Sequence, residues 1–254
     1  MNNLDFISRR YLYHYTKFCS GICILNSMTL LYHKLDEMND INELYRPLYF
    51  NNITVENKAK KEMSLFQQIS LTEDGKLRGF DIPAMWGHYG DKGNGVCIIL
   101  DKQKLLSSLP SKDIYKGSIM YVDDYSSDIY ISTNNLNDNI FHDDEIFDYF
   151  FKKSSDWAYE QEFRILKKVN KNNQMRLDIK DAFVGVIMHH DRKQINKDLS
   201  SIGSDNYNLL KTIVGEDKVF VYSMGLGQRT LIDNNLESIW GTMNFNLSDN
   251  NIDV

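Results

Sequence analysis

Two glutamates, Glu160 and Glu162, offer the most specific chemistry in this sequence. They lie in WAYEQEFRIL (157–166), whose alternation predicts a β-strand with both glutamates on one face and a mostly apolar face opposite. A solvated face on which Arg164 compensates the charge would show the same pattern. In a cleft, neighbouring carboxylates raise each other's pKa unless a cation is close. Such a pair can stabilise the developing sugar cation of glycosidic bond cleavage.

His14 is the second candidate. The segment YLYHYT (11–16) alternates three tyrosines with Leu12, His14 and Thr16, which predicts a first strand with His14 on the face opposite the tyrosines. A histidine in this position can be a hydrogen-bonded structural residue. Alternatively it can orient a ligand hydroxyl, because one nitrogen of a neutral imidazole donates a hydrogen bond and the other accepts one.

The segment MWGHYG (85–90) places Trp86, His88 and Tyr89 beside a loop with three glycines, 90–95. These aromatic side chains can anchor a core, or they can form a stacking surface for a planar ring with a polar group at its edge. The loop could bring backbone amides close to a phosphate. It matches neither the P-loop nor the dinucleotide-binding fingerprint, so it is a weak phosphate motif.

Two polar runs resemble metal ligands. The run 142–145 reads His-Asp-Asp-Glu, but consecutive helix positions point in different directions and do not converge on one ion. His189, His190 and Asp191 follow a predicted strand and fit a metal-dependent phosphoesterase or nuclease better. The cysteines lack the paired spacing of a zinc site. We therefore expect no metal.

The elements that position these residues predict a single α+β domain, because strands and helices are interspersed without regular βαβ alternation. The run 96–100 has no polar alternation, which predicts a central strand covered on both faces. Further strands are predicted at 68–72, 114–122, 182–188 and 218–224. Helices are predicted at 54–68, 83–89 and 139–153. The segment 18–31 is predicted to be a helix that runs into a short strand. We expect the domain to span 1–223, with 224–254 as an Asn-rich tail that is part of the same domain or loosely packed.

Composition narrows the classes of function. The chain has 254 residues, 42% hydrophobic and 25% charged, with a formal net charge of −6, which disfavours non-specific nucleic-acid binding. No apolar run approaches the roughly 20 residues of a membrane span, and the N-terminus lacks a signal-peptide core. We therefore expect a cytoplasmic protein without membrane contact. We also expect its three cysteines, Cys19, Cys23 and Cys97, to be buried reduced thiols.

Five blocks of the sequence together resemble a widespread bacterial domain-of-unknown-function family, number 2971. The resemblance runs from about residue 11 to about residue 190, and the blocks occur in the order of the family. Met38 stands where the family has a phenylalanine. The blocks are LYHYT (12–16), MND (38–40), ISLTED (69–74), MWGHYGDKGNGVCIIL (85–100) and FFKKSSDWAYEQEFRIL (150–166).

The layout of that family is similar to the ADP-ribosyltransferase superfamily, in the branch with a His, Tyr, Glu signature. This resemblance implies a split central sheet, mixed or antiparallel and flanked by helices, with NAD as substrate and no metal. It makes His14 the ligand of the adenosine-side ribose and Tyr89 or Trp86 the ring that stacks on nicotinamide. Glu160 or Glu162 would be the catalytic acid that steadies the oxocarbenium-like transition state.

The middle tyrosine of the signature has three candidates, Tyr15, Tyr32 and Tyr89. The full set of predicted NAD-binding residues is His14, Tyr15, Thr16, Trp86, His88, Tyr89 and Arg164. The resemblance implies cleavage of the nicotinamide–ribose bond and transfer of ADP-ribose to a macromolecule or to water, in a toxin or a phage-defence effector. The alternatives are a non-catalytic nucleotide- or partner-binding module and the metal-dependent phosphoesterase or nuclease.

Overall fold

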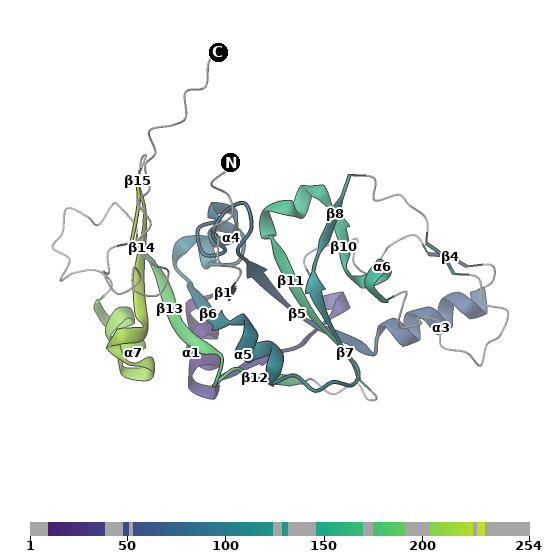
Figure 1. Cartoon of the computed structure of the whole chain (residues 1–254), viewed down its shortest axis with the longest axis horizontal. Coiled ribbons are helices and arrows are strands. Elements are labelled where there is room, and N and C mark those ends of the chain that lie inside the picture. Colours follow the sequence, from purple (N-terminus) through teal and green to yellow (C-terminus); the bar gives the residue numbers. More distant parts are fainter. Residues whose placement is uncertain are drawn as a thin grey trace, which may run out of the picture.

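A computed structural model describes residues 10–38, 48–50, 53–123, 129–131, 146–169, 175–190, 204–225 and 228–231. Its main sheet consists of β1 (Tyr11–Thr16), β3 (His33–Lys34), β5 (Phe66–Glu73), β6 (Val96–Asp101), β7 (Ile114–Ser118), β11 (Glu162–Lys168), β13 (Phe183–His190), β14 (Val219–Gly225) and β15 (Gln228–Leu231). The order is β15-β14-β13-β6-β1-β5-β11-β7 (Figure 1). The short strand β3 also pairs with β5. Only β13 and β14 pair in parallel among these described strands. This arrangement confirms the predicted α+β fold with a central mixed sheet.

Helices and shorter strands surround this sheet. Three two-stranded pairs join β2 (Thr29–Leu31) to β12 (Arg176–Asp178), β4 (Leu48–Phe50) to β9 (Ile129–Ile131) and β8 (Met120–Val122) to β10 (Lys152–Ser154). The α-helices are α1 (Phe18–Ser27), α3 (Ile53–Met63), α4 (Pro83–His88), α5 (Lys102–Ser107), α6 (Ile146–Phe150) and α7 (Ser204–Val214). The 3₁₀ turns are η1 (Leu35–Glu37), η2 (Asp91–Gly93), η3 (Ser155–Glu160) and η6 (Glu216–Lys218).

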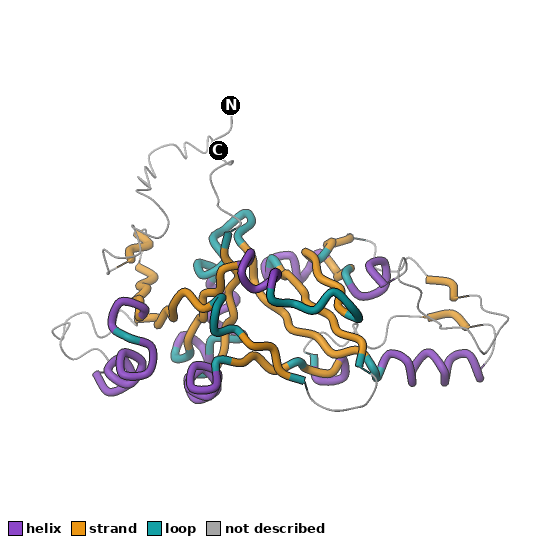
Figure 2. Tube along the Cα trace, turned by 60° about the horizontal axis from the view of Figure 1, so that its bottom comes forward, coloured by secondary structure: helices purple, strands orange, loops and turns teal. Residues whose placement is uncertain are grey.

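The middle of the sheet is buried on both faces, as the apolar run at 96–100 predicts. Every residue of β6 is buried between β1 and β13. Helices α1 and α7 lie side by side and cover one face with α5, while α4 packs on the other (Figure 2). Helix α1 approaches β6 so closely that a Cβ at Gly21 would lie 2.4 Å from Val96 Cγ2. Glycine is therefore required where the helix crosses the strand.

The sheet is split between β1 and β5. The two strands are in register only at Leu12 with Glu73 and Tyr13 with Thr72. Farther along the same edge of β5, the short strand β3 pairs with Gln67 and Gln68. Among the strands that the structure describes, none pairs with this edge of β5 between the two pairings, at residues 69–71, whereas β11 pairs along the other edge.

The structure corrects three boundaries that periodicity predicts. The predicted strand 157–166 is wrong in its first half, which forms the 3₁₀ turn η3 before β11 begins at Glu162. The predicted helix 54–68 ends at Met63, because the chain turns there into β5. In 139–153, the described part contains only the five-residue helix α6 before the strand β10.

The structure also tests the predicted burial of the cysteines and describes part of the C-terminal segment. Cys97 is buried in β6 as predicted, but Cys19 and Cys23 are exposed on α1, so burial does not explain those two thiols. Within 224–254, strand β15 pairs with β14 and extends the main sheet; residues 232–254 lie outside the described residues. Within the described ranges, no helix combines the length and the apolar composition needed to cross a membrane.

Candidate active site

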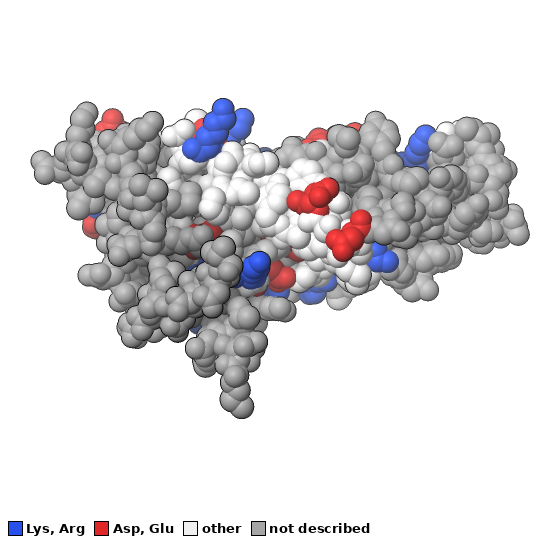
Figure 3. Space-filling model, turned by 90° about the horizontal axis from the view of Figure 1, so that it is seen from above, with Lys and Arg blue, Asp and Glu red and all other residues white. Residues whose placement is uncertain are grey.

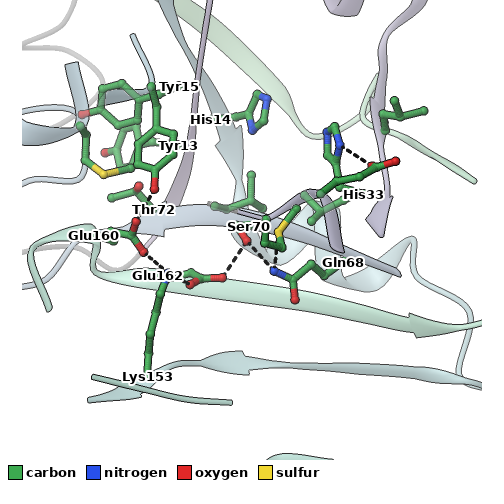
Figure 4. A pocket seen from close by; sticks show the side chains of 17 residues that line it. Tyr13, His14, Tyr15, His33, Gln68, Ser70, Thr72, Lys153, Glu160 and Glu162 are labelled. Atoms are coloured by element: carbon green, nitrogen blue, oxygen red, sulfur yellow. Dashed lines mark hydrogen bonds and ion pairs between the residues drawn. The ribbon is translucent and has the colours of Figure 1, made fainter. Parts of the chain in front are cut away.

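A cavity of about 230 Å³ lies at the split between β1 and β5 (Figure 4). His14 of β1 reaches it from one side, and Glu160 and Glu162 reach it from the other. Tyr15 and Tyr89 also line it. The cavity thus brings together five of the predicted site residues from three distant segments of the chain.

The backbone at Gln161 explains how both glutamates reach the cavity. Glu160 ends η3, Gln161 adopts a left-handed conformation with φ of 46°, and Glu162 begins β11. The carboxamide of Gln161 fixes this turn, because Nε2 donates to the Glu73 and Leu77 carbonyls at 2.9 Å each and Oε1 accepts from the Leu77 amide at 2.9 Å. The side-by-side arrangement therefore comes from a turn that joins two different elements.

Glu162 is a buried carboxylate held by cations. Arg164 donates from Nε to Glu162 Oε1 at 2.8 Å and from Nη2 to Oε2 at 3.0 Å, a bidentate pair. The Ser70 hydroxyl donates to Oε1 at 2.7 Å. Burial raises the pKa of Glu162, but the charges of Arg164 and Lys153 and these hydrogen bonds outweigh burial and lower it to about 2. Glu162 is therefore ionised at neutral pH.

Glu160 has a different environment. The Tyr89 hydroxyl donates to Glu160 Oε1 at 2.6 Å, and Lys153 Nζ donates to Oε2 at 2.7 Å. Burial raises the pKa of Glu160 above its usual value, Lys153 opposes that rise, and the neighbouring charge of Glu162 adds to it. The two carboxyl groups thus have pKa values that their surroundings shift in opposite directions, a pattern typical of acid–base pairs.

His14 faces the cavity as a neutral ring. Burial and, to a smaller extent, the nearby His33 lower the pKa of His14 to about 4, although an interaction with the backbone of Ser70 opposes the decrease. At neutral pH, one ring nitrogen can therefore donate a hydrogen bond and the other can accept one. This state suits recognition of a hydroxyl-bearing ligand.

The aromatic candidates divide into cavity residues and core residues. The Tyr15 hydroxyl donates to the Gly79 carbonyl at 2.7 Å, which fixes the ring at the cavity wall. Trp86 lies outside the cavity lining, is only 1% exposed, and donates from Nε1 to the Phe80 carbonyl at 2.8 Å. Its ring packs edge-on against Tyr15 at 5.1 Å, so Trp86 anchors the wall and has no direct access to a ligand.

Three other predicted binding residues also lie outside the lining. His88 is exposed at the end of α4, where its ring contacts Tyr159, and Thr16 is half-buried at the end of β1. Arg164 is buried behind Glu162, and its Nη1 donates to the Phe150 carbonyl at 2.6 Å. Arg164 therefore orients a carboxylate and does not reach a ligand itself.

Sequence patterns missed several residues of the cavity. Lys153 belongs to a Lys-Lys pair that suggests a solvated surface, yet its side chain is buried between the two glutamates. Ser70 and Met38 also line the cavity. They lie in blocks 69–74 and 38–40 of the family resemblance, and these blocks are the sequence feature that could have indicated them. His33 on β3 lines the cavity without any motif that would have indicated it.

The two runs that resemble metal ligands in the sequence gain no support from the structure. The ring of His189 packs against Trp86 at 5.6 Å and Tyr222 at 6.0 Å, and Asp191 lies outside the described residues. The run 142–145 also lies outside them. Among the residues that the structure describes, no group of three His, Cys, Asp or Glu side chains could hold a metal ion.

Residues 85–165 match the model of a family described as "Protein of unknown function (DUF2971)". The matched segment contains Tyr89, Lys153, Glu160 and Glu162, and the match supports the resemblance to that family. No curated protein and no solved structure matches the chain.

Proposed function

We propose that this protein is an ADP-ribosyltransferase-like enzyme that cleaves the nicotinamide–ribose bond of NAD and passes ADP-ribose to a macromolecule or to water. The observation that carries the proposal is a buried, ionised Glu162 beside Glu160, in one cavity with the neutral imidazole of His14. Glycosidic bond cleavage through an oxocarbenium-like transition state requires a negative charge close to the sugar.

Each carboxyl group has a role in the proposed reaction. When the C1′–N bond breaks, its electron pair goes to nicotinamide, which leaves as a neutral molecule without a general acid. The positive charge that develops on the ribose is stabilised by Glu162. The attacking oxygen forms the new C1′–O bond and gives its proton to the carboxylate of Glu160, whose raised pKa suits a general base.

The size of the cavity favours binding of one half of the dinucleotide. Its volume of about 230 Å³ falls below the ~300–1,000 Å³ of pockets that hold a drug-sized ligand. The tyrosine rings of Tyr13, Tyr15 and Tyr89 together with Met85 offer an apolar wall for nicotinamide. The nicotinamide riboside part would then lie between the tyrosines and the glutamates, and the adenosine-side ribose would extend towards His14.

The distribution of charge on the face drawn in Figure 3 indicates which class of partner this face could bind. Its described part is mostly uncharged, with scattered acidic and basic side chains and no continuous basic stripe (Figure 3). A basic stripe is what a nucleic-acid backbone would need for tight binding. This face gives more support to a small nucleotide or a protein partner.

One observation favours a second candidate, a nucleotide-binding module without turnover. Each carboxylate oxygen of both glutamates already has a partner in the protein: Arg164 and Ser70 bind Glu162, while Tyr89 and Lys153 bind Glu160. Such a network is stable without a reacting ligand. A binding module would take up NAD or a related nucleotide and release it unchanged.

Incubation with NAD labelled in the adenylate part distinguishes the two candidates, because chromatography follows the released nicotinamide and the label follows the ADP-ribose. The full chain is compared with Glu162→Gln, Glu160→Gln and a control, Glu216→Gln, which alters an exposed carboxylate on η6. We expect release by the wild type and the control, and a loss of about 10²- to 10³-fold in Glu162→Gln. If the wild type neither releases nicotinamide nor transfers label to any acceptor, the transferase proposal is wrong. Intact NAD recovered from a wild-type complex would then support the binding module.

A further inference from the structure

Lys153 occupies an unusual position at the cavity. It extends from β10, a strand that pairs with β8 outside the main sheet, towards the two glutamates (Figure 4). Its Nζ lies 2.7 Å from Glu160 Oε2 and 3.5 Å from Glu162 Oε2, and 4.7 Å from the centre of the Trp157 ring. The residue is only 5% exposed. A lysine is rarely buried to this extent unless its charge is paired.

A second buried cation at this site, Arg164, binds the other carboxylate. It donates from Nε and Nη2 to Glu162 and from Nη1 to the Phe150 carbonyl. Glu160 interacts at hydrogen-bonding distance with Lys153 and with the neutral hydroxyl of Tyr89. Lys153 therefore brings a positive charge within hydrogen-bonding distance of Glu160.

We propose that Lys153 is a positioning residue that keeps Glu160 ionised beside the ionised Glu162 and holds its carboxylate at the cavity wall. Two cations then balance two carboxylates in a site that excludes most of the solvent. Without Lys153, Glu160 would face the charge of Glu162 at close range and would take up a proton. In the proposed reaction, this inference explains how Glu160 is available to accept the proton of the acceptor, and to that extent it rests on the proposed function.

Other groups around Glu160 do not replace this charge. Tyr89 directly after α4, Tyr121 on β8 and Tyr159 on η3 present phenols, and burial raises the pKa of Tyr121 and Tyr159. The phenols of Tyr121 and Tyr159 are therefore neutral at pH 7. The Tyr89 hydroxyl donates a hydrogen bond to Glu160 and brings no positive charge. The imidazole of His14 across the cavity is neutral as well.

The test compares Lys153→Met and Lys153→Gln, which remove the charge, with Lys153→Arg, which retains it. Carboxyl carbon NMR titration of Glu160 in the full chain, without NAD, reports its ionisation directly. We expect the pKa of Glu160 to rise by about one unit or more in Lys153→Met and Lys153→Gln and to stay near the wild-type value in Lys153→Arg. If Lys153→Met does not fold, Lys153→Gln gives the same comparison, because it keeps a donor towards Glu160.

An unchanged titration of Glu160 in a folded variant without the charge overturns the inference. The titration needs no catalysis, so it decides the role of Lys153 even if the wild type does not cleave NAD. Where it does cleave NAD, the acidic limb of kcat/KM moves to higher pH in Lys153→Gln and returns in Lys153→Arg. A purely structural lysine would lower kcat/KM at every pH and leave that limb in place.

Discussion

His14 and Glu162 leave the main sheet on opposite faces, yet they line the same cavity. In the register of β1, Tyr13 lies opposite Thr72, and Thr72 lies opposite Glu162 on β11, so these three side chains share one face. His14, one residue along, therefore points to the other face. The cavity reaches both because β1 and β5 separate beyond Tyr13, and the gap connects the two faces. The split in the sheet is thus the feature that joins imidazole and carboxylate.

The role of His14 can be measured by nucleotide binding. We expect His14→Ala to weaken NAD binding by about 3- to 10-fold, the effect of one net hydrogen bond. Because the pKa of His14 is about 4, its ring is neutral throughout pH 5.5 to 7.5, and this difference should be constant over that range. Calorimetry at several pH values measures both quantities. His88→Ala, an exposed histidine outside the cavity, is the control and should bind as the wild type does. If the difference in NAD affinity between the wild type and His14→Ala disappeared within pH 5.5 to 7.5, the ring of His14 would titrate in that range.

The ionised state of Glu162 predicts how stability depends on pH. The folded-state pKa of about 2 lies below the ordinary value, so the carboxylate stabilises the fold above the ordinary pKa and loses this contribution as the pH falls towards 2. In Glu162→Gln, we expect the free energy of unfolding at pH 7 to fall by about 3–5 kcal/mol, since Arg164 keeps a buried charge without its counterion. Urea denaturation between pH 2 and 7 measures this. The dependence on pH should be weaker in the variant, and equal slopes in the two proteins would contradict the assignment.

The glutamate pair shows what periodicity can and cannot predict. The sequence identified Glu160 and Glu162 as neighbours, and the structure places both at one cavity. The predicted mechanism of their alignment, one continuous strand, is wrong, because Gln161 adopts a left-handed conformation that alternation does not reveal. Long-range hydrogen bonds to Glu73 and Leu77 stabilise that conformation, and a local pattern contains no information on such partners.

Burial was predicted well in the sheet and poorly around it. Strand β6 is buried along its whole length, as its apolar run predicts, because a central strand covered on both faces needs continuous apolar sequence. Strands β1, β13 and β14 form where strands were predicted. Lys153 could not be recognised as a buried cation, since its partners lie seven residues away in η3 and nine residues away in β11. Trp86 belongs to a motif that fits both stacking and core packing, and only its contacts decide between these interpretations.

Trp86 and Tyr89 should respond differently to substitution. Trp86→Leu removes a buried ring and its hydrogen bond to Phe80, so we expect a loss of about 3–5 kcal/mol in the free energy of unfolding. Tyr89→Phe removes only a hydroxyl at the cavity, and we expect a loss of about 1 kcal/mol with a clear decrease in nicotinamide release. Thermal denaturation and the release assay measure the two effects. If Trp86→Leu kept full stability and lost NAD binding instead, Trp86 would be a ligand-stacking residue.

Gln161 connects the stability of the fold to the geometry of the site. Its side chain connects the turn between Glu160 and Glu162 to the loop after β5 by hydrogen bonds with Leu77. The carboxamide of Gln161 also lies close to Gly75, where an added Cβ would be 2.8 Å from it. We expect Gln161→Gly to keep the turn accessible, because glycine adopts positive φ at no cost, but to release the turn from that loop. Gln161→Ala should lose the same hydrogen bonds and be less stable than Gln161→Gly by about 1 kcal/mol, since alanine is strained at this φ.

Both variants should release nicotinamide more slowly than the wild type, because the two carboxylates are no longer held in register at the cavity. Asp113→Gly is the matched control: Asp113 is exposed, has φ of 59° and lies outside the cavity lining, so relief of its backbone should leave the release rate unchanged. Chemical denaturation gives the order of stabilities, and the release assay gives the rates. A wild-type rate in Gln161→Gly would mean that the hydrogen bonds of Gln161 stabilise the loop alone and that η3 and β11 align the glutamates without them.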